Sequence, residues 1–214
     1  MRLRWSVYVT VFFFVAFAVF YFPATHADAA GKGVTVVGLY SETDAGHVSY
    51  RSGGGNWIVA KLGDQIPENA EIGITVDRDF VELTPSDNPA AVYEITGDPK
   101  GAAVTKKVAD LLKEKPKTVS FPKGAKDPKF VNKVVVKQYL GRQRFQKNGN
   151  ADWSEIRYGD VLGRQGTVNI IGINNTLILV LPNGNEKKVI GPLRFTIEKL
   201  LKGENLYKYL NVTK

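Results

Sequence analysis

The sequence contains one eight-residue pattern in two versions, Trp57-Ile58-Val59-Ala60-Lys61-Leu62-Gly63-Asp64 and, 96 positions later, Trp153-Ser154-Glu155-Ile156-Arg157-Tyr158-Gly159-Asp160. Tryptophan, glycine and aspartate stand at the same places in both versions, and the lysine of the first is matched by an arginine in the second. The same offset then aligns apolar residues without a gap, among them Ile72 with Val168 and Leu83 with Leu179. A repeat of this kind predicts that the chain contains two copies of one structural unit.

Short runs of β-branched and aromatic residues, separated by turn signals, fill both copies. Residues Val34–Tyr40 have the composition of a strand, and Ala70–Val76 alternates between apolar and other residues with a period of two. In the second copy, residues 167–173 and 176–181 are predicted to form a hairpin whose turn is Asn174-Asn175. Many short strands with frequent turns are typical of a β-sandwich or a β-barrel.

A helix is predicted to follow the strands of each copy. Apolar residues recur there at i, i+4, i+7 and i+8, which places them on one face of a helix. They are Val104, Val108, Leu111 and Leu112 in the first copy, and Leu193, Ile197, Leu200 and Leu201 in the second. The first helix is expected to run from about Ala102 to Lys115, where Pro116 ends it.

The expected fold is therefore mainly β, with two tandem β-sandwich-like repeats, each closed by one amphipathic α-helix. The first repeat with its helix is assigned to residues 30–115 and the second, with its helix and a tail, to residues 131–214. Residues 116–130 are rich in proline and lysine and are predicted to be an exposed linker.

Residues 1–29 are predicted to be a signal peptide. Two arginines precede an apolar run over residues 5–22, and Ala27-Asp28-Ala29 has the small-residue pattern of a processing site. Cleavage is therefore expected after Ala29, with cleavage after Ala27, at Thr25 and Ala27, as the alternative position. The alternative is an uncleaved anchor, since 18 apolar residues nearly span a bilayer. In both cases the positive residues stay in the cytoplasm and the rest of the chain is translocated. The protein is thus expected to be periplasmic or secreted, or anchored in the inner membrane facing the periplasm.

The residue types exclude several kinds of chemistry. The chain has no cysteine, which excludes disulfides, thiolate metal sites and a cysteine nucleophile. Once the signal region is set aside, His47 is the single histidine, so no zinc ligand set and no Ser-His-Asp triad is visible. No cofactor is expected, and an enzyme is the weaker interpretation.

The net charge of +8 suggests an anionic partner or surface. Lysines are concentrated around the linker, where they outnumber the nearby acids. We predict that they form a basic strip that contacts a partner, and the alternative is an ordinary solvated surface. The strip consists of Lys113, Lys115, Lys117, Lys123, Lys126, Lys129, Lys133 and Lys137.

The repeated residues themselves are interpreted as structural. Trp57 and Trp153 are predicted to be core anchors, so that Trp153→Ala would cost roughly 3–5 kcal/mol of stability. Gly63-Asp64 and Gly159-Asp160 are predicted to be turns. Two other functions remain open: the tryptophans could stack on sugars, and the two aspartates could act as the acid and base of a hydrolase if they converged in one cleft.

At the Trp-x5-Gly-Asp pattern the sequence resembles the FecR-like domain of bacterial envelope proteins. The similar residues are Trp57, Leu62 to Pro67, Ile72 and Phe80 to Leu83, and again Trp153, Tyr158 to Leu162, Val168 and Leu177 to Leu181. The resemblance implies an extracytoplasmic, β-rich domain that works by protein contacts. Well-known members signal to a sigma factor, but here only Met1 to Arg4 precede the apolar run, and the closing helices are not part of the pattern.

The function expected from the sequence is a non-catalytic module of the cell envelope. Its partner would be an envelope protein or an anionic polymer, and no nucleic acid is expected. A membrane contact is expected only through residues 5–22, if they are retained. The alternatives are a protein that binds peptidoglycan or another polysaccharide and an aspartate-dependent hydrolase. The sequence sets no oligomeric state.

Mass spectrometry of the native protein is expected to find an amino terminus at Ala30, because the processing pattern ends at Ala29. An intact Met1 in the membrane fraction would show instead that residues 5–22 remain as an anchor.

Overall fold

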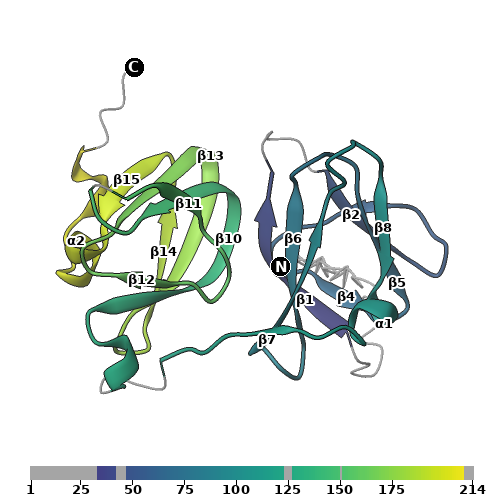
Figure 1. The fold of residues 1–214 in the computed structure, drawn as a ribbon, viewed down its shortest axis with the longest axis horizontal. Helices are drawn as coiled ribbons and strands as arrows, with labels where there is room; N and C mark the ends of the chain where they lie inside the picture. The colour runs from purple at the N-terminus through teal and green to yellow at the C-terminus, as the bar shows by residue number, and fades with distance from the viewer. Residues whose placement is uncertain (1–32, 42–46, 123–126, 150, 210–214) are drawn as a thin grey trace, which may run out of the picture. The chain divides into compact units, whose positions relative to one another are not determined.

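Strands make up most of the described chain, so the predicted mainly β class is confirmed (Figure 1). The computed structural model describes residues 33–41, 47–122, 127–149 and 151–209. The signal region and part of the linker lie outside these ranges.

The first half of the fold spans residues 33–111 and has eight strands and a one-turn helix. They are β1 (Gly33–Tyr40), β2 (Val48–Ser52), β3 (Ile58–Val59), β4 (Gln65–Pro67), β5 (Ala70–Ile74), β6 (Phe80–Pro85), β7 (Ala91–Thr96), β8 (Val104–Lys107) and α1 (Val108–Leu111). One group of neighbouring strands is β4-β1-β6-β7 and the other is β3-β2-β5-β8. Apolar residues from both groups meet in one core cluster that includes Val36, Ile72 and Leu83.

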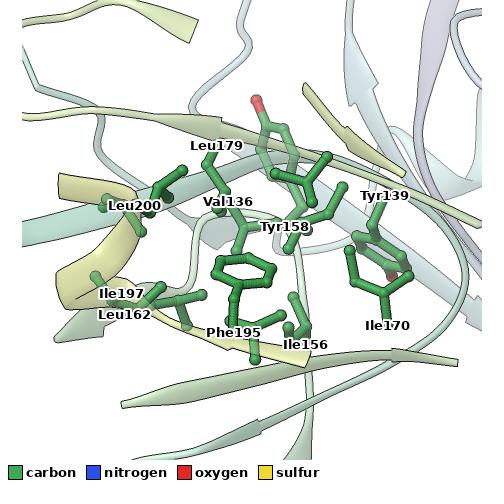
Figure 2. Packing of buried hydrophobic residues seen from close by; sticks show 14 of the residues in the cluster. Val136, Tyr139, Ile156, Tyr158, Leu162, Ile170, Leu179, Phe195, Ile197 and Leu200 are labelled. Carbon is green, nitrogen blue, oxygen red and sulfur yellow. The ribbon is translucent and has the colours of Figure 1, made fainter. Parts of the chain in front are cut away.

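The second half spans residues 133–201 and is joined to the first by β9 (Lys117–Thr118) and the 3-10 helix η1 (Pro128–Phe130). Its elements are β10 (Lys133–Gln146), β11 (Trp153–Glu155), β12 (Val161–Gly163), β13 (Thr167–Val180), β14 (Glu186–Ile190), β15 (Leu193–Thr196) and α2 (Ile197–Leu201), followed by η2 (Leu206–Tyr209). Figure 2 shows the packed interior, where Phe195 lies among Val136, Leu162 and Ile156.

Both halves contain the same six antiparallel strand pairings. In the second half β10 takes the places of both β1 and β2, and β13 takes the places of both β5 and β6. The registers also agree. In β1, Val36 pairs with Leu83, and the next residue of β1 has no partner in β6. In β10, Val136 pairs with Leu179, and the next residue of β10 has no partner in β13.

The Gly-Asp sequences form the same turn in each half. The N–H of Gly63 donates to the carbonyl oxygen of Val36 at 2.8 Å, and the N–H of Gly159 donates to that of Val136 at 2.8 Å. Both glycines have positive φ, 88° and 79°, a conformation that glycine adopts at little steric cost. The turn thus attaches the end of the repeated pattern to the first strand of its own half.

The hairpin predicted at residues 167–181 is wrong, because these residues form the single strand β13. β10 pairs with both parts of β13, so the strand continues across the predicted turn. Residues 172–175 make an excursion opposite Gly141, in which Asn174 has a φ of 64° and the side-chain amide of Asn175 donates to the carbonyl oxygen of Ile171.

The first predicted helix is wrong over most of its length, and the second is wrong over its first four residues. Residues 104–107 form β8, which pairs with β5, and residues 193–196 form β15, which pairs with β13. Only α1 and α2 are helical, with four and five residues. The i, i+4 spacing gave a wrong prediction because one apolar residue of each stripe belongs to a strand. In segments this short, pairing with a distant strand outweighs the tendency to form a helix.

The linker is more buried than predicted. β9 pairs with β7, Val119 is buried against Gly159, and Phe121 makes an edge-to-face contact with Tyr158 at 5.3 Å between ring centroids. Phe130 of η1 is buried as well. The segment after α1 therefore contributes apolar contacts to the second half.

A buried carboxylate, Glu82 of β6, receives hydrogen bonds from the second half. The Tyr139 hydroxyl donates to Glu82 Oε2 at 2.7 Å, and the Tyr158 backbone N–H donates to the same oxygen at 2.8 Å. Nearby, β1 and β10 make a short parallel pairing that sets Gly38 beside Tyr139, and a Cβ at Gly38 would overlap the tyrosine ring. The missing side chain at Gly38 is what lets Tyr139 reach Glu82.

Burial raises the pKa of Glu82, and the hydrogen bonds from Tyr158 and Tyr139 and the charge of Arg157 offset part of this effect. The Arg157 guanidinium carbon lies 3.3 Å from the centroid of the Phe80 ring, and its Nη1 lies 3.6 Å from a carboxylate oxygen of Glu94. Burial and the nearby Glu82 also raise the pKa of Tyr158 to about 12. The contact between the halves is thus polar and charged as well as apolar.

Gly38→Ala is expected to lower the free energy of unfolding by about 1–3 kcal/mol, because the new methyl group overlaps the Tyr139 ring. Chemical denaturation measures the change. Gly163→Ala is the matched control, since a Cβ there meets no atom within 4 Å and should change stability by no more than about 0.5 kcal/mol. Equal effects of the two substitutions would contradict the role given to Gly38.

Glu82→Gln is expected to change how stability depends on pH. A carboxyl whose pKa is raised by folding stabilises the native state below its unfolded pKa, and this contribution is lost as pH rises through the folded pKa. The wild type should therefore lose stability relative to Glu82→Gln as pH increases above 4.5, the ordinary pKa of a glutamate. Denaturation of both proteins over a pH series measures the difference, and a constant difference would refute the assignment.

Candidate functional site

The two tryptophans lie on the surface, so their predicted role as core anchors is wrong. The Trp57 side chain is 43% exposed and Trp153 is partly exposed. Trp57 lies next to the edge strand β3 and Trp153 begins the edge strand β11, and the ring of Trp57 covers Gly73 on the outer side of the sheet. Smaller aliphatic residues and Tyr or Phe fill the cores instead, so the cost expected for removing a core tryptophan does not apply.

Each tryptophan ring is covered by an arginine. The guanidinium carbon of Arg51 lies 4.7 Å from the centroid of the Trp57 ring, and that of Arg194 lies 5.1 Å from the centroid of the Trp153 ring. Contacts at these distances are cation–π interactions, which hold an arginine in place. One face of each indole is therefore occupied by the protein itself.

The two aspartates of the repeated pattern cap their own turns. Asp64 Oδ2 accepts from the backbone N–H of Lys61 at 2.8 Å, and Asp160 Oδ2 accepts from that of Arg157 at 2.8 Å. Burial raises the pKa of Asp160, while its hydrogen bond and the nearby Lys117 and Arg157 lower it. The geometry thus ties each carboxylate to a turn in its own half.

The predicted lysine strip is divided among several elements and partly neutralised. Lys113 is paired with Asp110 at 2.8 Å, Lys137 is paired with Glu186, and Lys133 donates to the carbonyl oxygen of Lys129 at 3.2 Å. Lys115 and Lys117 are exposed, whereas Lys123 and Lys126 lie outside the described residues. The described part of the strip does not form one cluster of unpaired charge.

A different set of cations gathers on the outer face of the sheet β11-β10-β13-β15. Glu155, Arg144, Asn169 and Arg194 stand directly opposite one another on the four strands, and Arg142 stands opposite Ile171. Residues paired in this way share one face of a sheet, and so do residues two apart on a strand. We call the side chains of Arg142, Arg144, Asn169 and Arg194, with Trp153 beside them, the arginine face.

The arginines of this face have no carboxylate within 4 Å among the residues that the structure describes. The adjacent Glu155 is paired with Arg157 instead, at 3.0 Å. Arg142 Nε is buried and, within the described chain, has no hydrogen-bond partner. The corresponding row of the first half is Val59, Ser49, Gly73 and Thr105, and its nearby Arg51 is paired with Glu71 at 2.7 Å. Within the described chain, arginines without a carboxylate partner thus occupy this row in the second half and are absent from it in the first.

A pocket of about 620 Å³ adjoins the arginine face and shares Asn169 and Arg194 with it. Its other walls come from the end of the first part of β13, from β15 and the residue before it, and from α2, η2 and the segment between them. Those residues are Ile170, Ile171, Gly172, Pro192, Leu193, Phe195, Lys199, Glu204, Asn205 and Leu206.

Sequence reasoning missed the arginine face because it looked for charge in one continuous stretch. The available signal was alternation: Arg142 and Arg144 flank the buried Gln143, and Arg194 lies between the buried Leu193 and Phe195. Alternation marks an outward face on each strand. It does not show which strands are neighbours, and this is what brings Arg194 near Arg144.

The described residues contain neither a cluster of metal ligands nor a helix that could span a membrane. No group of three or more potential ligand side chains in this part of the chain is placed to hold a metal ion. No described helix has the length and apolar character needed to cross a membrane.

Comparison of this chain with family models, with curated proteins and with solved structures finds no match.

Proposed function

We propose that this chain is an extracytoplasmic interaction module that binds an anionic partner through the arginine face and does no chemistry of its own. The observation that supports the proposal is the unpaired charge of Arg142, Arg144 and Arg194 on one sheet surface. A guanidinium is always charged at physiological pH, and its planar donors match carboxylates and phosphates. An anion placed across these strands would supply the partners that the described chain does not provide.

The arrangement also favours an extended ligand over a single small anion. Arg144 and Arg194 are two strands apart, and neighbouring strands are about 4.8 Å apart. Their backbones are therefore separated by roughly 10 Å, with Asn169 between them. A chain with several acidic groups can contact both arginines and donate to or accept from the amide of Asn169.

A compartment outside the cytoplasm is part of the same proposal. It rests on the apolar run over residues 5–22, the pattern at Ala27-Asp28-Ala29 and the resemblance to FecR-like domains. The proposal keeps the domain type and the mode of action by contact, and it leaves out the sigma-factor signalling of the well-known members.

A second candidate is a polysaccharide-binding protein, which the exposure of the tryptophans favours. An exposed indole face suits a sugar ring. The arginines that cover Trp57 and Trp153 count against this candidate, because they occupy the surface that a sugar would need. Binding that rested on stacking would also resist salt, whereas binding to the arginine face would weaken.

The double variant Arg144→Gln, Arg194→Gln is expected to capture about ten-fold less of the main partner from a native envelope extract, since both charge-assisted contacts are lost. Added salt should weaken capture by the wild type, as the screening length falls from about 10 Å at 0.1 M to about 3 Å at 1 M. A quantitative pulldown at a series of salt concentrations measures both effects.

The matched control is Lys187→Gln, Lys188→Gln, which removes two exposed charges from β14 and leaves the arginine face intact. It should capture as much partner as the wild type. Equal losses in the two double variants would show that only net charge matters, and salt-resistant capture of glycan alone would favour the polysaccharide candidate.

A further inference from the structure

We infer that the partner is an acidic protein segment that inserts a large apolar side chain into the pocket beside the arginine face. This inference rests on the proposed function, because it names the kind of partner that the same surface would bind. Three observations support it: the pocket is continuous with the charged surface, its walls are largely apolar, and an isoleucine is exposed next to it.

The charged surface and the pocket share two side chains. Arg194 lies on the arginine face and also lines the pocket, and so does Asn169. Ile171, which stands opposite Arg142, lines the pocket as well. A ligand that contacts the arginines therefore reaches the pocket without leaving the sheet surface.

The pocket has the size and chemistry for an apolar group. Its volume of about 620 Å³ is within the usual range for sites that hold small organic groups, about 300–1,000 Å³. Most of its lining residues are apolar or glycine, and the polar ones are Asn169, Arg194, Lys199, Glu204 and Asn205. Burial of an aliphatic or aromatic side chain against such walls contributes favourably to the free energy of binding. The hydroxyl groups of a sugar would be left there without hydrogen-bond partners.

Ile173 extends this apolar surface. It belongs to the excursion of β13 and follows Ile171 and Gly172 of the pocket, and its side chain is 75% exposed. The excursion corresponds to residues 76–79 of the first half. Arg78 there has a φ of 62°, nearly the same as the 64° of Asn174. The residue that corresponds to Ile173 is then Asp77, so the first half places a charge where the second exposes an isoleucine.

A protein partner fits these features better than a glycan does. Acidic and large apolar side chains occur together in peptides, and a cation beside an apolar pocket matches that combination. Trp153, the residue that would favour a sugar, is covered on one face by Arg194. In this arrangement the tryptophan positions the arginine.

Three soluble polyanions can test the inference with the purified full-length chain. The probes are poly-L-glutamate, a random copolymer of glutamate and tyrosine, and polygalacturonate, compared at equal charge concentration by calorimetric titration. The copolymer is expected to bind about ten-fold tighter than poly-L-glutamate, because burial of one large apolar side chain contributes that much or more. Polygalacturonate should bind no tighter than poly-L-glutamate.

Two substitutions test whether the tighter binding of the copolymer depends on the pocket. Ile171→Asn makes one wall polar, and Ile173→Ser removes an exposed apolar side chain with little expected effect on folding. Both should bring the ratio of the affinity for the copolymer to the affinity for poly-L-glutamate close to one. Ile58→Asn, which changes an exposed isoleucine of the first half, is the matched control and should keep the full preference.

The outcomes separate this inference from the proposed function. If poly-L-glutamate binds through the arginines but the copolymer binds no tighter, the apolar part is wrong and the proposed function stands. If no polyanion binds, or if Arg144→Gln, Arg194→Gln binds all three like the wild type, the proposed function fails as well. If polygalacturonate binds tightest, the partner is a glycan and the inference is overturned.

Discussion

The contact between the halves depends on one hydrogen-bonded group, the buried carboxylate of Glu82 with the Tyr139 hydroxyl and the Tyr158 backbone N–H. A buried carboxylate without partners would cost several kcal/mol, so the residues that satisfy it have to stay in place. Tyr139 can approach only because residue 38 is a glycine, and Tyr158 follows Arg157, whose guanidinium lies on Phe80. The two halves are thus joined by groups that fit one relative arrangement of these strands.

The halves share their strand pairings, and they differ in the residues on their outer faces. Where β2, β5 and β8 place Ser49, Gly73 and Thr105 in a row, β10, β13 and β15 place Arg144, Asn169 and Arg194. Pairing is set by backbone hydrogen bonds and by the inward residues, so outward residues can change with little effect on the fold. This separation explains how one architecture can carry a row of small uncharged residues in one half and a row with two arginines in the other.

The mainly β class could be predicted from the sequence because it depends on local composition, which β1 shows, and on period-two alternation, which the sequence of β5 shows. The two helices could not, since Val104 and Leu193 have the spacing of a helix but pair with strands that are distant in the sequence. The tryptophans were misassigned for a related reason: hydrophobicity favours burial, but Trp57 and Trp153 lie at edge strands with arginines covering them. The arginine face was missed because the neighbours of a strand are a property of the whole sheet.

Unpaired cations carry an energetic cost that helps to separate structural from functional charge. The charge of Arg51 is compensated within the fold, since its guanidinium covers the Trp57 ring and is also paired with the carboxylate of Glu71. Arg194 has a comparable ring contact with Trp153 and no carboxylate within 4 Å among the described residues, and Arg142 keeps a buried Nε without a hydrogen bond there. The like charges of Arg142, Arg144 and Arg194 on one sheet face repel one another. Under the function proposed above, a negatively charged ligand would offset that repulsion, and the same arginines would then contribute to binding.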